Sequence, residues 1–285
     1  MDIPRIAFFG TPDIGVYVLD ELEAAGIVPT IVITNPDAPR GRKLVLTETP
    51  VAAWARERGI PCLKPESLDA DDVLASLRKS GVELFIIAAY GKRIPSAILA
   101  LPRYGALNVH PSLLPALRGA SPIRSAILEN VNPTGVSIMV PVERMDAGPV
   151  VAREEVRIPE SEWPTRGRTL DELLARRGGA LLARILPDWI SGTLTAEAQD
   201  ESRATYAKKI TKEMGEIDVA ADPSENLRKI RAFDGWPGAY FFTEKGGRRI
   251  RVKIVDARLT DGSLVITRVI PEGKQEMDYE TFLRS

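Results

Sequence analysis

The chain has 285 residues, of which 44% are hydrophobic and 27% are charged, so it can bury one large core and leave room for a second small domain. This composition excludes a disordered or fibrous protein. The formal net charge of −1 excludes the strong basic excess of many nucleic-acid binders, so local basic clusters matter more. The sequence lacks a signal-peptide pattern and an uncharged window of membrane-spanning length, so we expect a cytoplasmic protein without a membrane partner.

Strands and helices are predicted to alternate over the first half of the chain. A buried strand at residues 5–9 is followed by a turn and by apolar residues at helical spacing from Ile14 to Leu22. Further strands are expected at residues 28–34, 60–63, 82–89 and 105–109, and helices at residues 49–58, 69–79 and 95–101. The apolar run at 82–89 is typical of a parallel strand that is buried on both faces. This alternation predicts a Rossmann-like, doubly wound α/β fold with a mostly parallel sheet.

The second half of the chain predicts the end of this sheet and a smaller domain. Strands are expected at residues 135–140 and 150–158, and a capping box, Thr169 to Glu172, predicts a helix that ends before Ser191-Gly192. A helix at 223–232 and alternating segments at 248–255 and 263–269 favour a small β-rich, OB-like domain. We therefore expect a large α/β domain at 1–192, a polar linker at 193–206 and a small C-terminal domain at 207–285.

Cysteine and histidine usage limits the possible chemistry. Cys62 is the only cysteine and His110 the only histidine, which excludes an intramolecular disulfide and a thiolate metal cluster. One histidine is also too few for the usual zinc sites, so we expect no metal. Cys62 lies in a predicted buried strand, where packing is a more common role than catalysis.

Asn108 and His110 stand at the carboxyl end of a predicted strand, where open parallel sheets bind their ligands. Residues two apart in a strand project to the same side, so both side chains can face one pocket. The imidazole can take and return a proton near neutral pH, and the amide can donate a hydrogen bond to an oxyanion. The pair predicts acyl-transfer chemistry. The alternatives are a structural histidine bonded to the backbone and an asparagine that forms a local turn.

A carboxylate usually orients an imidazole that acts as acid or base. Glu143 and Asp146 both follow a later predicted strand, and spacing alone does not separate them. Each could equally be a carboxylate on a surface loop.

The run Asn108-Val109-His110-Pro111-Ser112-Leu113-Leu114-Pro115, with Arg118-Gly119 and Asp146 downstream, resembles the signature of the folate-dependent formyltransferases. Other segments resemble the branch of this family that acts on methionyl-tRNA: Phe9 to Asp13, Asn35 to Asp37, Arg40 to Leu44, Ala89 to Gly91, Thr134 to Val136, Arg231 to Phe233 and Trp236-Pro237. The resemblance covers nearly the whole chain. The sequence departs from the family pattern at Ala116, Leu117 and Ala147.

The resemblance implies transfer of a formyl group from 10-formyltetrahydrofolate to the α-amine of initiator methionyl-tRNA. It implies that Asn108 binds the oxyanion, that His110 relays the proton, and that Asp146, rather than Glu143, orients the imidazole and tunes its pKa. It also implies a folate site lined by Ser112, Leu113, Leu114, Pro115 and Tyr90. It further implies that residues 1–192 are the formyltransferase catalytic domain and that residues 207–285 bind the tRNA. We expect a monomer whose partners are the tRNA and folate.

Binding of tRNA needs cations, and these occur in local clusters. The clusters are Arg40, Arg42 and Lys43; Lys208, Lys209 and Lys212; and Lys245, Arg248, Arg249, Arg251 and Lys253. The predicted tRNA contacts are Arg40, Arg42, Lys43, Lys208 and Lys209, and the alternative for every cluster is a solvated face.

Three other functions compete with this one. An amino-sugar nucleotide N-formyltransferase would use the same folate donor and the same three residues, and a formyl-folate hydrolase would use water as the acceptor. A non-catalytic nucleotide-binding module is disfavoured, because the turn Gly10 to Asp13 lacks the G-x-G-x-x-G pattern.

Overall fold

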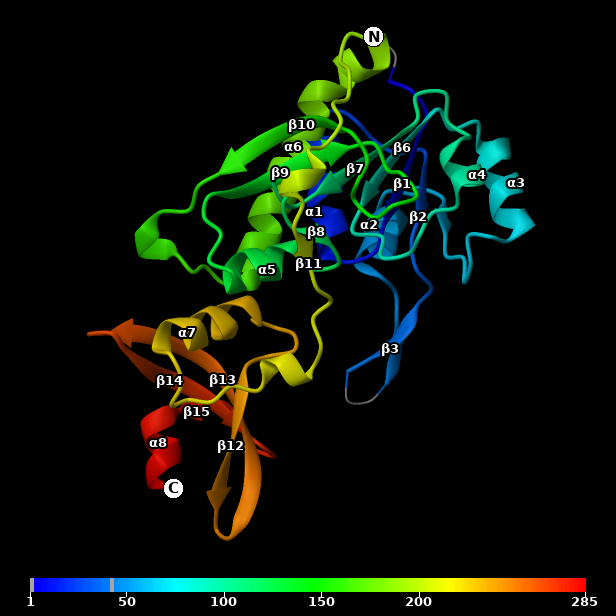
Figure 1. The fold of residues 1–285 in the computed structure, drawn as a ribbon. Helices are drawn as coiled ribbons and strands as arrows, with labels where there is room; N and C mark the ends of the chain where they lie inside the picture. The colour runs from blue at the N-terminus through cyan, green and yellow to red at the C-terminus, as the bar shows by residue number, and fades with distance from the viewer. Residues whose placement is uncertain (1–2, 42–43) are drawn as a thin grey trace. The chain divides into compact units, whose positions relative to one another are not determined.

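Figure 1 shows the computed structural model of the chain, which describes residues 3–41 and 44–285. The chain forms two compact units, each assembled from several segments. Unit 1 comprises Met1–Arg118, Gly135–Val156 and Glu172–Thr205, and unit 2 comprises Gly119–Thr134, Arg157–Asp171 and Tyr206–Ser285. The domain boundaries expected near residues 192 and 207 stay a prediction.

A seven-stranded sheet forms the centre of unit 1. Its strands are β1 (Ile6–Gly10), β2 (Ile31–Ile33), β5 (Cys62–Leu63), β6 (Leu84–Ala88), β7 (Ala106–His110), β9 (Thr134–Met139) and β10 (Val150–Val156). Their order is β10-β9-β7-β6-β1-β2-β5. Neighbouring strands from β5 to β7 are parallel, whereas β9 runs antiparallel to β7. The predicted mostly parallel α/β sheet is thereby confirmed.

Helices cover both faces of this sheet. They are α1 (Asp13–Ala24), α2 (Pro50–Glu57), α3 (Asp71–Ser80), α4 (Ser96–Leu99) and α6 (Gly167–Ser191). On one face, Phe9, Phe85 and Ile87 share a core cluster with buried residues of α3 and α4. On the other face, Val109 of β7 lies against Gly178 of α6. Because side chains alternate along a strand, Asn108 and His110 project toward the face that α3 and α4 cover.

Shorter segments complete unit 1. A hairpin of β3 (Ala38–Arg40) and β4 (Val45–Thr47) extends away from the main sheet (Figure 1). After α6 the chain returns along the sheet: Glu197 exchanges two backbone hydrogen bonds with Val150, and a 3-10 turn follows at Glu201–Arg203. The polar stretch expected to be a linker therefore includes residues that pack against unit 1.

Unit 2 contains a four-stranded antiparallel sheet in the order β12-β13-β14-β15. These strands are β12 (Tyr240–Lys245), β13 (Arg248–Thr260), β14 (Ser263–Pro271) and β15 (Met277–Asp278). The helices are α5 (Pro122–Leu128), α7 (Pro223–Ala232) and α8 (Tyr279–Arg284), with 3-10 turns at Glu160–Glu162 and Glu213–Gly215. The short strands β8 (Arg118–Gly119) and β11 (Tyr206–Ala207) pair with each other. The predicted β-rich C-terminal region is confirmed.

The core of unit 2 joins its sheet to its helices. Phe241 and Val252 of the sheet share one buried cluster with Leu227 of α7 and Phe282 of α8. Among the described residues, every helix is too short or too polar to cross a membrane.

The N-terminus of α2 gives a stability test. Thr49 is buried, accepts a hydrogen bond from the Ala52 amide, and shares a 2.8 Å hydrogen bond with the hydroxyl of Thr34. We predict that Thr49→Ala lowers the free energy of unfolding by about 1–2 kcal/mol, because the cap is lost. Thr49→Ser keeps the hydroxyl and should stay close to the wild type in urea denaturation. Equal losses in both variants would contradict a capping role.

Candidate active site

His110 is the last residue of β7, and its ring is buried with 4% of the residue exposed. The ring Nε2 lies 3.0 Å from the backbone oxygen of Leu117. A carbonyl oxygen only accepts hydrogen bonds, so Nε2 is the donor in this contact. In the neutral ring, Nδ1 then has a free lone pair and is the nitrogen able to take up a proton.

Of the two candidate carboxylates, Glu143 and Asp146, it is Asp146 that lies near Nδ1 of His110. Its Oδ2 lies 3.8 Å from Nδ1 of His110, which is longer than a hydrogen bond but close enough for a strong charge interaction. Glu143 is 86% exposed and lies 3.6 Å from Arg93. The ring is therefore held by a backbone carbonyl, while the carboxylate supplies charge.

Burial lowers the pKa of the His110 imidazole below its usual value, since the charged ring loses its hydration. The charge of Asp146 and the Leu117 carbonyl both act to raise this pKa, but burial has the larger effect. At neutral pH the ring is therefore uncharged and can act as a base.

Asn108 lies on the same strand and projects to the same side as His110. Its backbone is fixed between two strands, paired with Ile87 of β6 and Met139 of β9. Its side chain is half-buried and has no hydrogen-bond partner among the described residues. The amide is thus free to donate a hydrogen bond to a ligand beside the imidazole.

The loop after His110 is held by its own hydrogen bonds. The Ser112 hydroxyl donates to the Ala116 carbonyl at 2.6 Å, and the Ser137 hydroxyl donates to the Ser112 carbonyl at 2.7 Å. The Leu114 amide donates to the Ser137 hydroxyl, and Arg153 donates to the Leu114 carbonyl. Ser112 and Leu114 are buried and fix the loop, so Leu113 and Pro115, both half-buried, are the members left to contact a ligand.

Tyr90 belongs to a second polar group at the carboxyl ends of β1, β2 and β6. Its backbone oxygen accepts hydrogen bonds from the Thr11 hydroxyl and the Asn35 amide, both at 3.3 Å. The Tyr90 hydroxyl and the Asn35 Oδ1 are buried and lack a hydrogen-bond partner within the described part of the chain. Burial raises the pKa of Tyr90 to about 12, so its hydroxyl stays protonated and able to donate.

The predicted tRNA contacts lie on different segments. Arg40 ends β3 and its backbone pairs with Val45, whereas Arg42 and Lys43 lie outside the described residues. Lys208 and Lys209 follow β11 and are exposed.

The basic hairpin of unit 2 combines cations with aromatic rings. The Arg249 guanidinium lies 4.2 Å from the ring centre of Phe242, and the Arg251 guanidinium lies 4.8 Å from that of Tyr240. Lys245 instead donates to Ser285 and lies against the Phe282 ring. The two arginine–aromatic pairs resemble the stacking surfaces that bind nucleic acids.

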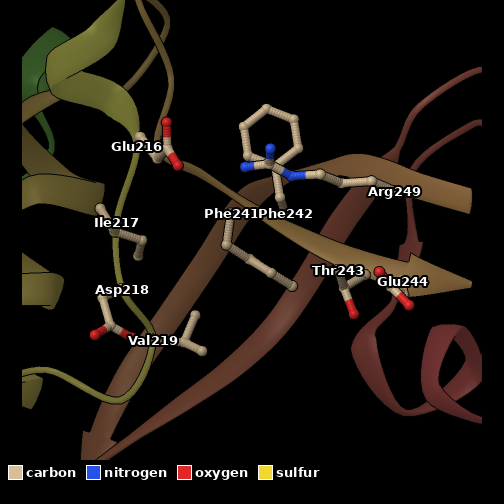
Figure 2. A pocket seen from close by; sticks show the side chains of 9 residues that line it. All are labelled: Glu216, Ile217, Asp218, Val219, Phe241, Phe242, Thr243, Glu244 and Arg249. Atoms are coloured by element: carbon tan, nitrogen blue, oxygen red, sulfur yellow. The ribbon is translucent and has the colours of Figure 1, made fainter.

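Figure 2 shows a pocket of about 440 Å³ in unit 2, in which Arg249 lies over Phe242. The pocket is lined by Glu216, Ile217, Asp218, Val219, Phe241, Phe242, Thr243, Glu244 and Arg249. The chain's one histidine belongs to unit 1, so we do not place the acyl-transfer chemistry in this pocket.

Two residues that hydrogen-bond to the backbone of Asp146 and Leu117 were not predicted from the sequence. Gln199 donates to the backbone oxygens of Asp146 and Gly148, and the Thr205 hydroxyl accepts from the Leu117 amide. Both lie in a polar, aperiodic stretch, so neither a motif nor a hydrophobic pattern singled them out.

No group of three or more His, Cys, Asp or Glu side chains in residues 3–41 and 44–285 is arranged to hold a metal ion. Cys62 is half-buried, and burial raises the pKa of its thiol, which makes the reactive thiolate less available.

Comparisons with known proteins place most of the chain in one family. Residues 4–176 match the family model described as formyl transferase, and residues 209–262 match the model of its C-terminal domain. The methionyl-tRNA formyltransferase of Bacillus licheniformis is 39% identical over 98% of this chain and 94% of its own. That of Chloroflexus aggregans is 39% identical over 93% of this chain and 84% of its own.

One solved structure with a similar fold is the N-formyltransferase of Helicobacter canadensis, in complex with folinic acid and dTDP-3-aminofucose. It is 17% identical, with a TM-score of 0.63, over 91% of this chain and 89% of its own. At this identity the likeness concerns the fold.

The single histidine allows a direct pH test. We predict that ¹⁵N-histidine NMR gives one imidazole titration with a midpoint below 6.5, because burial disfavours the charged ring. The unfolded chain binds this proton more readily, so the contribution of His110 to stability is present above about pH 6.5 and is lost as the pH falls through the folded pKa. A midpoint above 6.5 would mean that the charge of Asp146 outweighs burial.

Proposed function

We propose, because this chain belongs to the formyl transferase family, that it transfers a formyl group from 10-formyltetrahydrofolate to the α-amine of initiator methionyl-tRNA. The resemblance that the sequence motifs indicated is confirmed by the family match and by relatives named methionyl-tRNA formyltransferase. The reaction would serve translation initiation. The observation on which the chemistry rests is the buried His110 ring beside Asn108, between the Leu117 carbonyl and Asp146.

In the proposed reaction the amine attacks the formyl carbon and forms a tetrahedral intermediate. The attacking nitrogen must then lose a proton, and the folate nitrogen N10 must gain one before the carbon–nitrogen bond to it breaks. His110 can perform both steps through Nδ1, because Nε2 already donates to Leu117. A neutral imidazole first accepts the proton and, as the imidazolium, returns it to the leaving nitrogen.

Asn108 and Asp146 would stabilise the charges that this sequence creates. The Asn108 amide, which has no protein partner among the described residues, would donate a hydrogen bond to the oxyanion of the intermediate. The Asp146 carboxylate, 3.8 Å from Nδ1, would stabilise the transient imidazolium by its charge. These roles are those that the resemblance implied, and the hydrogen bond between Nε2 and the Leu117 carbonyl is a second contact that would hold the ring.

Two features support a folate donor site near His110. The rigid loop after the histidine leaves Leu113 and Pro115 half-buried, which suits contact with a flat heteroaromatic ring. The Tyr90 hydroxyl and Asn35 Oδ1, which have no hydrogen-bond partner in the part of the chain that the structure describes, supply one donor and one acceptor at the same edge of the sheet. The N-formyltransferase of Helicobacter canadensis, which has a similar fold, was determined in complex with folinic acid.

A tRNA acceptor is favoured over an amino-sugar nucleotide. The relatives that are 39% identical to this chain are named for methionyl-tRNA. The exposed Lys208 and Lys209 and the arginine–aromatic hairpin supply the cations and stacking surfaces that RNA binding uses. The cytoplasmic location and the monomeric state expected from the sequence stay predictions.

The acceptor assay tests this proposal. Purified protein with 10-formyltetrahydrofolate should formylate initiator methionyl-tRNA, and transfer should weaken steeply as salt rises, because phosphate contacts release counterions. Transfer to a dTDP-amino sugar but not to the tRNA would establish the alternative function. Formate release without transfer to either acceptor would establish a hydrolase.

Asp146 and Glu143 form a matched pair for testing whether the charge of Asp146 stabilises the His110 imidazolium. We predict that Asp146→Asn lowers kcat by about 10²- to 10⁴-fold, the range typical of lost acid-base catalysis, because the imidazolium loses its counter-charge. Glu143→Gln changes an exposed carboxylate that faces Arg93 and should leave kcat within about twofold of the wild type. Steady-state formyl transfer at saturating folate and tRNA measures both. Equal losses in the two variants would rule out a specific role for Asp146.

A further inference from the structure

The carbonyl that holds the His110 ring belongs to a residue with unfavourable backbone geometry. Leu117 has a φ of +56°, in the left-handed region that bulky residues rarely adopt. Thr205 makes three hydrogen bonds to this part of the backbone. Its hydroxyl accepts from the Leu117 amide at 2.8 Å, and its carbonyl accepts from the Arg118 amide at 2.9 Å. Its amide donates to the Pro115 carbonyl. Thr205 therefore fixes the direction of the Leu117 carbonyl.

The carboxylate beside the ring is held in a comparable way. Asp146 also has a left-handed backbone, with a φ of +51°. Gln199, which is 8% exposed, donates from its Nε2 to the backbone oxygen of Asp146 at 2.8 Å and to that of Gly148 at 2.6 Å. These two hydrogen bonds tie together the turn that presents the carboxylate.

A buried arginine fixes the orientation of the glutamine. Arg118 is fully buried, and its Nε and Nη2 both donate to Oε1 of Gln199, at 3.0 and 2.8 Å. Because Oε1 of Gln199 accepts hydrogen bonds from the guanidinium, the side-chain amide nitrogen of Gln199 points toward the backbone oxygen of Asp146. Arg118 also donates to Glu201, and hydrogen bonds from Arg118 and Arg144 lower the pKa of Glu201 to about 2. Arg118 stays charged, so this orientation persists across the pH range in which His110 titrates.

We propose that residues 199–205, the supporting segment, position the catalytic groups: Thr205 sets the tautomer of His110 through Leu117, and Gln199 sets the place of the Asp146 carboxylate. This proposal rests on the roles proposed above for His110 and Asp146. In it Gln199 and Thr205 touch neither substrate nor reacting atoms, and both act through a second residue. The segment expected to be a linker thereby becomes part of the catalytic architecture.

Thr205 is tested by two variants that differ in one hydroxyl. Thr205→Val removes the acceptor for the Leu117 amide, whereas Thr205→Ser keeps it. Because His110 is the only histidine, ¹⁵N-histidine NMR reports its tautomer without any assignment step. The wild type and Thr205→Ser should show the Nε2–H form, and Thr205→Val should show a mixture with the Nδ1–H form. The same Nε2–H spectrum in all three proteins would overturn the role of Thr205.

Gln199 is tested by a change that preserves shape. Gln199→Glu keeps an oxygen for Arg118 but replaces the amide donor to Asp146 and Gly148 by an acceptor, so the turn is no longer held. The same change at the exposed Gln275 is the matched control. We expect Gln199→Glu to lower kcat on the order of 10- to 100-fold with little change in the KM for folate, as for a misplaced catalytic group. Gln275→Glu should keep the wild-type kcat.

A double-mutant cycle separates positioning from a general loss of structure. Asp146→Asn should lower the NMR pKa of His110 in the wild type and in Gln275→Glu, because the charge of Asp146 raises that pKa. In the Gln199→Glu background the same substitution should shift the pKa by less. An equal shift in all three backgrounds would overturn the role of Gln199.

These NMR measurements need no substrate. The wild type could therefore show no formyl transfer while the Thr205 and Gln199 variants give the expected tautomers and pKa shifts. That combination would contradict the proposed reaction and would still support the positioning roles. If Gln199→Glu fails to fold, judged by circular dichroism, Thr205→Val and Thr205→Ser still decide whether the supporting segment controls the ring.

Discussion

The hydrogen bond from Nε2 of His110 to the Leu117 carbonyl is the contact on which the proposed chemistry depends. A buried imidazole can serve as a base only if one nitrogen keeps its lone pair and that nitrogen faces the substrate. A carbonyl oxygen meets this requirement because it accepts and never donates. The Leu117 carbonyl therefore keeps the hydrogen on Nε2 and introduces no charge next to the ring. Asp146 can then act on the imidazolium as a nearby charge.

The strands make this contact possible but do not complete it. Strand β7 ends at His110, and its pairing with β6 and β9 fixes which way Asn108 and the imidazole project. The partners of the ring come from loops, and Leu117 and Asp146 both adopt left-handed backbone there. Such conformations cost energy and persist only where surrounding contacts hold them. Here those contacts come from a segment far along the chain, which returns along the sheet after α6.

Proton transfer and acceptor binding place different demands on the protein. The first needs a dry, rigid environment, and unit 1 provides it through a buried ring and a loop held by internal hydrogen bonds. The second needs exposed cations and flat surfaces, and the hairpin of β12 and β13 in unit 2 has Arg249 and Arg251 stacked on aromatic rings. A chain with a net charge of −1 can therefore still offer local sites for a phosphate-bearing acceptor.

The sequence by itself determined the parallel α/β sheet, the β-rich C-terminal region and the pairing of Asn108 with His110, because these follow from local hydrophobic periods and from alternation along a strand. The motifs determined the family. The antiparallel direction of β9, the Leu117 carbonyl and the supports Gln199 and Thr205 were decided only by the tertiary structure. These features depend on contacts between residues distant in the chain, or on loop conformations that such contacts stabilise. Distant contacts and loop conformations leave no periodic pattern in the sequence.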